Sequence, residues 1–388
     1  MANQKQEVKV MSARDGAVKH QHRAVTVLVQ LVVLTAVVIA VWYFGHVINE
    51  RLTQKGINTG FGFLWTRAGF DLSESMIAFS GDKSYAYALL AGFSNTLKVA
   101  LCAIVFSVLL GVLAALAQLS KFGLARRIAK VYVSTIRNTP LLLQLFFWFA
   151  VFTYGLPVVR EALEPLPGLF ISNRGVNFPW PTPFALTAIV AIFCTVVAFI
   201  LRSVRTGGSA LKNPGALLIL LSLIAFVSTA YALWSGQMTF EWPTASKFSI
   251  GGGGHFSPEF MSMFIGLSVY TGTYIAEAIR GAVQSIAQGQ IAAGYALGLT
   301  HFGVLRYIVM PQAFRIAMPA VVSELLNLMK NSSLGVAVGY PELVSAGNTA
   351  MNQTGQAIEL ISIFMLVYVT VNIITTRVIG LWEKHYVW

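Results

Sequence analysis

Long apolar stretches separated by shorter polar segments run along the whole chain. A helix needs about 20 consecutive, mostly apolar residues to cross the hydrocarbon core of a bilayer. Several stretches approach or exceed that length. The least apolar of them is the seventh, at 312–334, because a proline and several polar residues interrupt it. The pattern predicts an all-α membrane protein with about eight transmembrane helices. We place these spans at 24–44, 89–119, 140–159, 184–201, 215–234, 258–279, 312–334 and 358–381.

The segments between these stretches differ in character. Residues 1–23 are polar and of mixed charge, which is typical of a flexible tail. The prolines between 160 and 183 argue against one continuous helix there. The four glycines Gly251–Gly254 predict a flexible linker. Between the last two spans we expect a short re-entrant or surface element at 335–352.

Charge adds an orientation to this picture. Only 11% of the 388 residues are charged, yet the net charge is +12. A basic chain can bind nucleic acid, but the placement of the charge argues otherwise. Two thirds of the lysines and arginines, and only a fifth of the acids, fall on the side that holds both termini and the loops at 120–139, 202–213 and 280–315. Because positively charged loops stay inside, we expect both termini to be cytoplasmic and no nucleic-acid partner.

Enzymatic chemistry finds no support in the sequence. No G-x-x-x-x-G-K-[ST] motif occurs, so ATP binding through a P-loop is not expected. The six histidines lack the spacing of zinc ligands. Cys102 and Cys194 lie within apolar stretches, where cysteine usually packs as a small hydrophobic residue. We therefore predict no catalytic residue, no metal site and no cofactor in this chain.

The connector between the sixth and seventh spans has an unusual composition. From Ala276 to Met318 it holds three arginines and no acid after Glu277, and its middle is rich in glycine and alanine. Small residues let a backbone approach a partner closely, so this segment could sit in a groove of another protein. The alternative is a surface loop whose small residues pack against its own helices. Composition alone leaves both interpretations open.

The same segment resembles the cytoplasmic loop of ABC-importer permeases, in which an EAA-xxx-G pattern followed by I-x-LP forms helices that dock on the ATPase. Ala292-Ala293-Gly294 stands at the EAA, Gly298 at the glycine, and Ile308-x-Met310-Pro311 at the I-x-LP. The chain departs from the family at two positions, with alanine in place of the glutamate and glycine in place of the last alanine. Flanking residues resemble the polar amino-acid ABC transporter permeases. This implies ATPase-coupling roles for Glu277, Arg280, Gly281, Gly289, Ala292, Ala293, Gly298 and Pro311.

Two further motifs extend the resemblance. Arg137-Asn138-Thr139-Pro140 is similar to a stretch of the same permeases, and Gly92-x-x-x-Thr96-Leu97 fits the start of their first core span. They imply a type I importer core of five helices. An insertion between its halves most resembles the large permease subunit of general L-amino-acid importers for glutamate, glutamine, aspartate and asparagine. The expected organisation is a cytoplasmic tail (1–23), an additional N-terminal helix (24–45), a periplasmic loop (46–88), the first half of the permease core (89–159), a two-helix insertion (160–257) and the second half of the permease core (258–388) with a coupling loop at 281–311.

Polar side chains at membrane depth are costly, so each is a candidate for function. In the seventh span, Glu324, Asn327 and Asn331 share one helix face. Lys330 beside them could attract a substrate carboxylate. The alternative is that such groups only join helices by hydrogen bonds. The candidates for a translocation pathway are Gln144, Thr271, Tyr274, Glu324, Asn327, Lys330, Asn331 and Ser332.

The resemblance implies a permease subunit of an ATP-driven importer of polar L-amino acids in a bacterial inner membrane. Alternating access would be coupled through the cytoplasmic loop to ABC ATPase subunits, which bind ATP and magnesium. A periplasmic amino-acid-binding protein and a second permease, related but non-identical, are the other expected partners. Two alternatives remain: an ion-coupled secondary transporter that uses carboxylates such as Glu324 or Glu359, and a membrane scaffold without transport.

Overall fold

The computed structural model describes residues 29–40, 42–47, 50, 51, 54, 60–181, 240–246 and 249–383. The predicted tail at 1–23 and the predicted spans at 184–201 and 215–234 lie outside the described residues. The described chain divides into two compact units. One holds residues up to 65 together with 350–363, and the other holds 66–349 and the residues from 364 onward.

The first unit contains an apolar helix, Val29–Val47, which is long enough to cross a membrane. The short 3-10 helix η1 (Phe61–Trp65) follows it in the chain. Gly60 donates its backbone N–H to a carboxylate oxygen of Glu359 at 2.8 Å. Glu359, one of the carboxylates considered for ion coupling, is therefore engaged by the backbone of its own unit.

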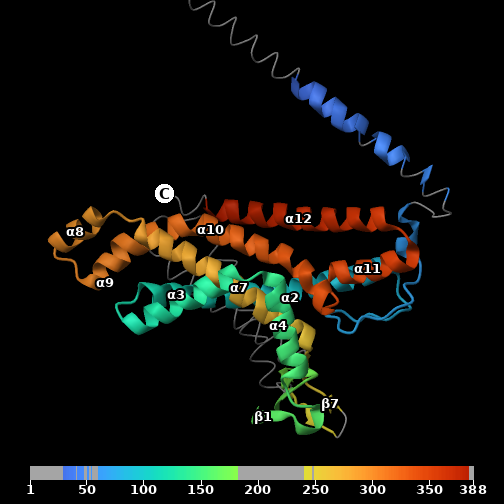
Figure 1. Cartoon of the computed structure of the whole chain (residues 1–388), viewed down its shortest axis with the longest axis horizontal. Coiled ribbons are helices and arrows are strands. Elements are labelled where there is room, and N and C mark those ends of the chain that lie inside the picture. Colours follow the sequence, from blue (N-terminus) through green and yellow to red (C-terminus); the bar gives the residue numbers. More distant parts are fainter. Residues whose placement is uncertain are drawn as a thin grey trace, which may run out of the picture. The chain divides into compact units, whose positions relative to one another are not determined.

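Helices form the frame of the second unit (Figure 1). α2 extends for 35 residues and begins where the Ser84 side chain accepts a hydrogen bond from the N–H of Tyr87. α7 likewise begins with Ser257 as its cap and Pro258 in its first turn. The helices are α2 (Tyr85–Leu119), α3 (Gly123–Asn138), α4 (Leu141–Tyr154), η2 (Val159–Glu161), α7 (Pro258–Gln284), α8 (Gln288–Ala296), α9 (His301–Val304), the π-helical stretch η3 (Leu305–Val309), α10 (Met310–Asn331) and the 3-10 helix η4 (Ser332–Val338); α11 (Leu343–Thr354) and α12 (Ala357–Glu383) run through both units.

The core of this unit lies where α2 crosses α7. Glycines allow the close approach: a Cβ added at Gly111 of α2 would lie 2.6 Å from the Cγ2 atom of Ile275 on α7. Gly266 of α7 similarly makes room for Leu145 of α4, whose Cδ2 atom would lie 2.5 Å from an added Cβ. Small residues at crossings are the usual way for membrane helices to pack closely. α7 is thus a central helix, against which α2, α4 and α10 pack.

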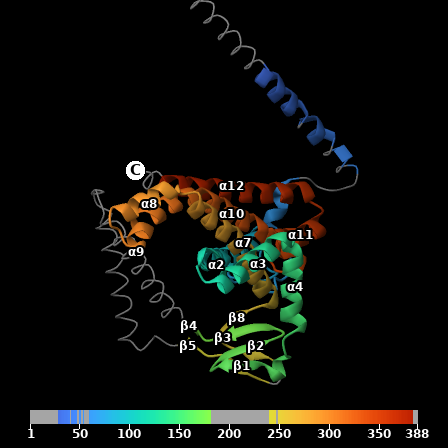
Figure 2. The ribbon, with the colours of Figure 1, turned by 60° about the vertical axis from the view of Figure 1, so that its left-hand side comes forward.

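Short strands lie at one end of these helices (Figure 2) and correct the all-α prediction. Four of them form an antiparallel sheet of order β1-β2-β3-β8, and the others form two two-stranded sheets. The flexible linker predicted at Gly251–Gly254 is wrong, because its ends lie in strands and Gly252 and Gly253 form the turn between them with φ of 77° and 68°. The strands are β1 (Leu163–Leu166), β2 (Leu169–Ser172), β3 (Gly175–Phe178), β4 (Trp180–Pro181), β5 (Phe240–Glu241), β6 (Thr244–Ala245), β7 (Ile250–Gly251) and β8 (Gly254–Phe256).

The helical character expected from the sequence is confirmed. Among the described residues, four helices are long and apolar enough to cross a membrane, namely Val29–Val47, Tyr85–Leu119, His301–Val338 and Ala357–Arg377, and Leu141–Tyr154 is a shorter apolar helix. One boundary differs clearly from the prediction. The seventh helix begins at His301 instead of residue 312, because the Thr300 side chain caps it by accepting a hydrogen bond from the N–H of Gly303. The last residues of the predicted coupling loop are therefore the start of a long helix.

Candidate functional site

A short exposed helix, α8, forms in the segment between the predicted sixth and seventh spans. It follows the end of α7, whereas the strand β8 precedes the start of α7, so α8 and the sheet lie at opposite ends of that helix (Figures 1 and 2). Gly289, Ala292 and Ala293 are all exposed on α8. Leu297, directly after the helix, is 82% exposed. The outer face of α8 therefore carries small residues together with Gln288, Gln290 and Tyr295, and Leu297 follows it as a large exposed apolar side chain.

The inner face of α8 rests on the helix that follows it. Gly294 is buried there, and a Cβ added to it would lie 2.5 Å from the Cδ1 atom of Ile308 and 3.1 Å from a methyl group of Val304. This explains glycine in place of the family's alanine at this position, because Ile308 occupies the space of a methyl group. Gly298 then ends the segment with a φ of 79°, a conformation that favours glycine.

The helix beneath α8 has two irregular points. Its hydrogen bonding is π-helical over Leu305–Val309, directly opposite the packing face of α8. Pro311 lies in the first turn of α10, where proline is well tolerated, but Pro319 lies inside the helix and removes a backbone donor. Bends and hinges in helices commonly occur at such π stretches and prolines. A force on α8 would therefore act on a helix that can bend nearby.

Glu277 and Arg280 form an ion pair within the last turns of α7. The Nε atom of Arg280 donates to both carboxylate oxygens of Glu277, at 3.1 and 3.2 Å. The side chains are each 27% exposed, and Arg280 also donates to Gln284. Gly281 is exposed, with open space around it. Both partners belong to α7. The pair stabilises the last turns of α7, after which the chain continues to α8.

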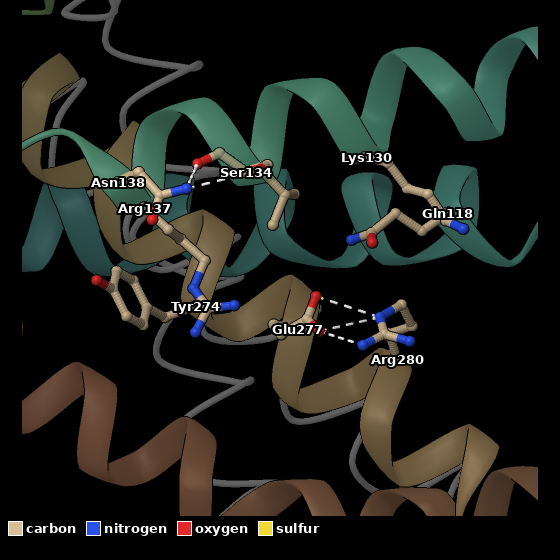
Figure 3. A pocket seen from close by; sticks show the side chains of 9 residues that line it. Gln118, Lys130, Ser134, Arg137, Asn138, Tyr274, Glu277 and Arg280 are labelled. Carbon is tan, nitrogen blue, oxygen red and sulfur yellow. Dashed lines mark hydrogen bonds and ion pairs between the residues drawn. The ribbon is translucent and has the colours of Figure 1, made fainter.

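Beside this ion pair lies a cavity of about 480 Å³ between α2, α3 and α7 (Figure 3). Tyr274 borders it, with its hydroxyl 3.1 Å from that of Tyr270. The guanidinium carbon of Arg137 lies 4.9 Å from the centre of the Tyr274 ring, a cation–π arrangement. The structure therefore brings one predicted pathway residue next to two predicted coupling residues. The cavity is lined by Gln118, Lys130, Val133, Ser134, Arg137, Asn138, Tyr274, Glu277 and Arg280.

Three predicted pathway residues are buried within the bundle. Gln144 of α4 donates to the carbonyls of Ile136 and Thr139 at 2.9 and 3.0 Å, which closes the end of α3. Ser332 donates to the carbonyl of Met329 at 2.6 Å, and Thr271 is 2% exposed on α7. Burial of all three residues, together with the local hydrogen bonds of Gln144 and Ser332, favours a structural role for them.

The polar residues of α10 have a different environment. Asn327 and Lys330 are exposed, whereas Glu324 and Asn331 are partly buried. In the described portion of the chain, none of these four side chains has a hydrogen bond or an ion pair to another residue. Among the described residues, the alternative that Glu324 and Lys330 join helices by bonding to other residues of the bundle is therefore not seen.

The prediction missed a buried polar cluster where α2 meets the loop before α11. Asn95 and Tyr340 are both fully buried, and the Tyr340 hydroxyl donates to the carbonyl of Asn95 at 3.2 Å. The Thr96 hydroxyl accepts from the N–H of Leu343 at 3.1 Å. Glu342, also fully buried, accepts from the backbone at the start of α11. The Gly92-x-x-x-Thr96-Leu97 motif was the only signal of this contact in the sequence.

Lys98, one turn further along α2, was also missed as a partner. Its ammonium group pairs with the carboxylate of Glu74. It also lies 4.6 Å from the ring centre of Phe260 and 5.3 Å from that of Phe256. The Ser257 hydroxyl donates to the other oxygen of Glu74 at 2.6 Å. These contacts tie the loop before α2 to the start of α7.

The comparison with known protein families gives one match that covers most of the chain. Residues 107–386 match the family described as binding-protein-dependent transport system inner membrane component. Alignments with individual related proteins cover a larger share of the chain than the family match does. The general L-amino acid transport system permease protein AapQ of Rhizobium johnstonii is 38% identical over 364 residues, which are 90% of this chain and 89% of the relative.

Two further relatives have similar coverage. The putative amino-acid ABC transporter permease protein YhdX of Escherichia coli is 34% identical over 92% of this chain and 93% of its own length. The glutamate/glutamine/aspartate/asparagine transport system permease protein BztB of Rhodobacter capsulatus is 31% identical over the same shares. A solved structure described as an amino acid ABC transporter with histidines is 19% identical, with a TM-score of 0.48 over 78% of this chain and 95% of its own. The chain therefore belongs to the inner membrane component family of binding-protein-dependent, ABC-type transport systems.

Proposed function

We propose that this chain is the transmembrane permease subunit of an ATP-driven importer of polar L-amino acids. Family membership supports transport driven by a separate ATPase, and the names of the three relatives support amino acids as substrates. Eight spans with both termini in the cytoplasm fit the distribution of charge. At the end of the second unit that holds α8, the chain carries Arg126, Arg127, Lys130, Arg306 and Arg315, as the inside of a membrane protein should.

The single observation that carries the coupling mechanism is the exposed small-residue face of α8. Its glycine and alanines leave the helix backbone accessible to a partner, while Gly294 locks its inner face against Ile308. An ATPase that holds α8 differently with and without ATP would shift the helix beneath it. Pro319 and the π-helical stretch Leu305–Val309 offer the bending points. Such differential contact is what a population shift between two access states requires.

The other partners follow from the same arrangement. ATP and magnesium would bind to the ATPase and not to this chain. A periplasmic amino-acid-binding protein would approach the end that carries the sheet, opposite to α8. The polar residues near the end of α10, including Lys330, are offered as the region of this chain that contacts the substrate carboxylate. A second permease, related but non-identical, would complete the membrane domain.

The test is reconstitution of the complex in liposomes with its ATPase and binding protein. Uptake of labelled glutamine or glutamate is measured with ATP inside and no ion gradient. The proposal expects uptake that requires ATP and survives a proton ionophore. Uptake that needs an ion gradient and proceeds without ATP would establish the secondary-transporter alternative instead.

A further inference from the structure

The cavity between α2, α3 and α7 is lined by charged residues that are not part of the substrate pathway proposed along α10. Three of its lining residues are basic, namely Lys130, Arg137 and Arg280, and one is acidic. The acid, Glu277, is already paired with Arg280. The surplus of positive charge in the cavity therefore comes from the two basic residues of α3.

These two residues can offer positive charge to an anion, although the charge of Arg137 also acts on Glu277 nearby. Lys130 and Arg137 are seven positions apart, so they lie on the same side of α3 two turns from each other. Among the described residues neither has an ion-pair partner, and Arg137 is positioned by the ring of Tyr274 beneath it. Figure 3 shows Arg137 beside Tyr274 at one side of the cavity and Lys130 near Gln118 at the other, with Glu277 and Arg280 below.

Within the part of the chain that the structure describes, a buried side-chain amide in the cavity also lacks a hydrogen-bond partner. Gln118, near the end of α2, is 5% exposed and lines the cavity. Its Nε2 atom is buried without a hydrogen-bond partner among the described residues. An N–H donor in that position needs an acceptor, because buried polar groups are nearly always hydrogen-bonded. Together Gln118, Lys130 and Arg137 offer donors from two helices to one volume.

We propose that this cavity binds a phosphate group, as carried by an anionic phospholipid headgroup at the inner surface of the membrane. Basic pockets between helices on the cytoplasmic side are suited to such headgroups. The cavity adjoins α3, whose apolar side chains Leu124, Ile128 and Val131 are each at least 60% exposed, as expected of a helix that lies against lipid. A volume of about 480 Å³ accommodates a headgroup as well as a free phosphate ion. This site goes beyond the proposed transport function and rests on it only for the cytoplasmic orientation of α3.

The test measures binding of two probes to the purified full-length chain in a neutral detergent. One probe is phosphatidylglycerol, and the other is inorganic phosphate at matched ionic strength. Native mass spectrometry counts retained lipid, and the unfolding midpoint reports stabilisation by either probe. The variants are K130Q/R137Q, the charge-preserving K130R/R137K, and R126Q/R127Q, which removes the same charge from α3 outside the cavity.

The proposal expects phosphatidylglycerol to raise the unfolding midpoint and to remain bound. K130Q/R137Q should weaken binding by about tenfold or more, since hydrogen bonds to charged groups contribute on that scale. K130R/R137K should fold and keep most of the binding, and R126Q/R127Q should keep it fully. A shift with inorganic phosphate that follows the same variant pattern supports the phosphate site and shows free phosphate as a second source. Equal loss in R126Q/R127Q, or no shift in the wild type with either probe, would overturn it.

Discussion

The side-chain amide nitrogen of Asn95 donates a hydrogen bond of 2.8 Å to the carbonyl of Pro341, across 246 positions of the sequence. The same side chain donates to the carbonyl of Glu74 at 2.8 Å and accepts from the N–H of Met76 at 2.9 Å. One fully buried residue thus joins α2 to the loops that precede α2 and α11. A buried polar group stabilises the folded state when it is hydrogen-bonded and destabilises it when it has no partner.

Asn95→Ala should therefore lower the free energy of unfolding by about 2–3 kcal/mol, because it leaves buried backbone groups unpaired. The measurement is the unfolding midpoint of the purified chain in detergent. Ser94→Ala is the matched control, since among the residues that the structure describes its hydroxyl bonds only to the carbonyl of Ala91 within the helix. Equal small effects of both substitutions would show that the Asn95 cluster contributes little.

The crossing of α2 and α7 gives a second prediction. Gly111→Ala should destabilise the chain by about 1–3 kcal/mol, because the new methyl group meets Ile275 in a packed core. Gly111→Leu should prevent correct packing and reduce the yield of folded protein. Gly123→Ala at the start of α3 is the control, since open space surrounds that position. A midpoint unchanged by Gly111→Ala would mean that the two helices are not in close contact there.

Glu342 gives a prediction about pH. It lies between the candidate spans, and burial raises the pKa of its carboxyl from the ordinary 4.5 to about 7. The folded chain therefore holds this proton more tightly than the unfolded chain. The stability that comes from the bound proton is complete below about pH 4.5 and is lost as the pH rises through about 7.

The loss amounts to a few kcal/mol at most, since one pKa unit corresponds to about 1.4 kcal/mol. Unfolding midpoints measured across this pH window should fall with rising pH. In Glu342→Gln that component of the slope should vanish, because the amide does not titrate. An identical slope in the variant and the wild type would place the titrating group elsewhere.

The ion pair at the end of α7 makes a prediction about coupling. Glu277→Gln or Arg280→Gln should reduce ATP-driven uptake, because the last turns of α7 lose the bond that fixes them before α8. The exchanged variant E277R/R280E keeps an ion pair at the same spacing and should recover some of the rate. Full uptake with both residues neutralised would exclude a mechanical role for the pair.

Lys330 tests the proposed substrate contact. Lys330→Ala should raise the half-saturation concentration for uptake about tenfold, the scale of one hydrogen bond between charged groups. Lys330→Arg keeps the charge and should have a smaller effect. Ser323→Ala is the matched control, since Ser323 is exposed on the same helix and is not a pathway candidate. If Lys330→Ala leaves the kinetics unchanged for every amino acid tested, the pathway does not use this residue.

The sequence predicted the long helices well, because uninterrupted apolar runs such as the one ending at Leu119 have few alternatives in a membrane. The glycine and alanine content between α7 and α10 left two interpretations open, and the helix there was expected from the family resemblance. The sheet was missed because Gly251–Gly254 and the nearby prolines suggested loops. In the structure Gly252 and Gly253 form the turn between two very short strands, and Gly251 and Gly254 lie in those strands.

The site was predicted only partially for a related reason. Glu277 and Arg280 are neighbours on one helix, so their pairing follows from spacing. The cavity beside them requires Gln118 from α2 and Arg137 from α3, which are far from Tyr274 in sequence. Only the folded arrangement of three helices brings such residues together. Similarly, the sequence around Asn95 does not indicate that its side chain donates a hydrogen bond to Pro341.

The most direct test of the coupling mechanism is whether α8 holds the ATPase. The tagged chain is purified gently from its native membrane, and the proteins that come with it are identified by mass spectrometry. A version with residues 289–299 scrambled is compared with the wild type, and a version with the exposed strand β1 scrambled at the opposite end serves as control. The coupling mechanism predicts an ABC ATPase with the wild type and with the control, and its loss when α8 is scrambled. An ATPase retained equally by all three forms, or found with none, would contradict it.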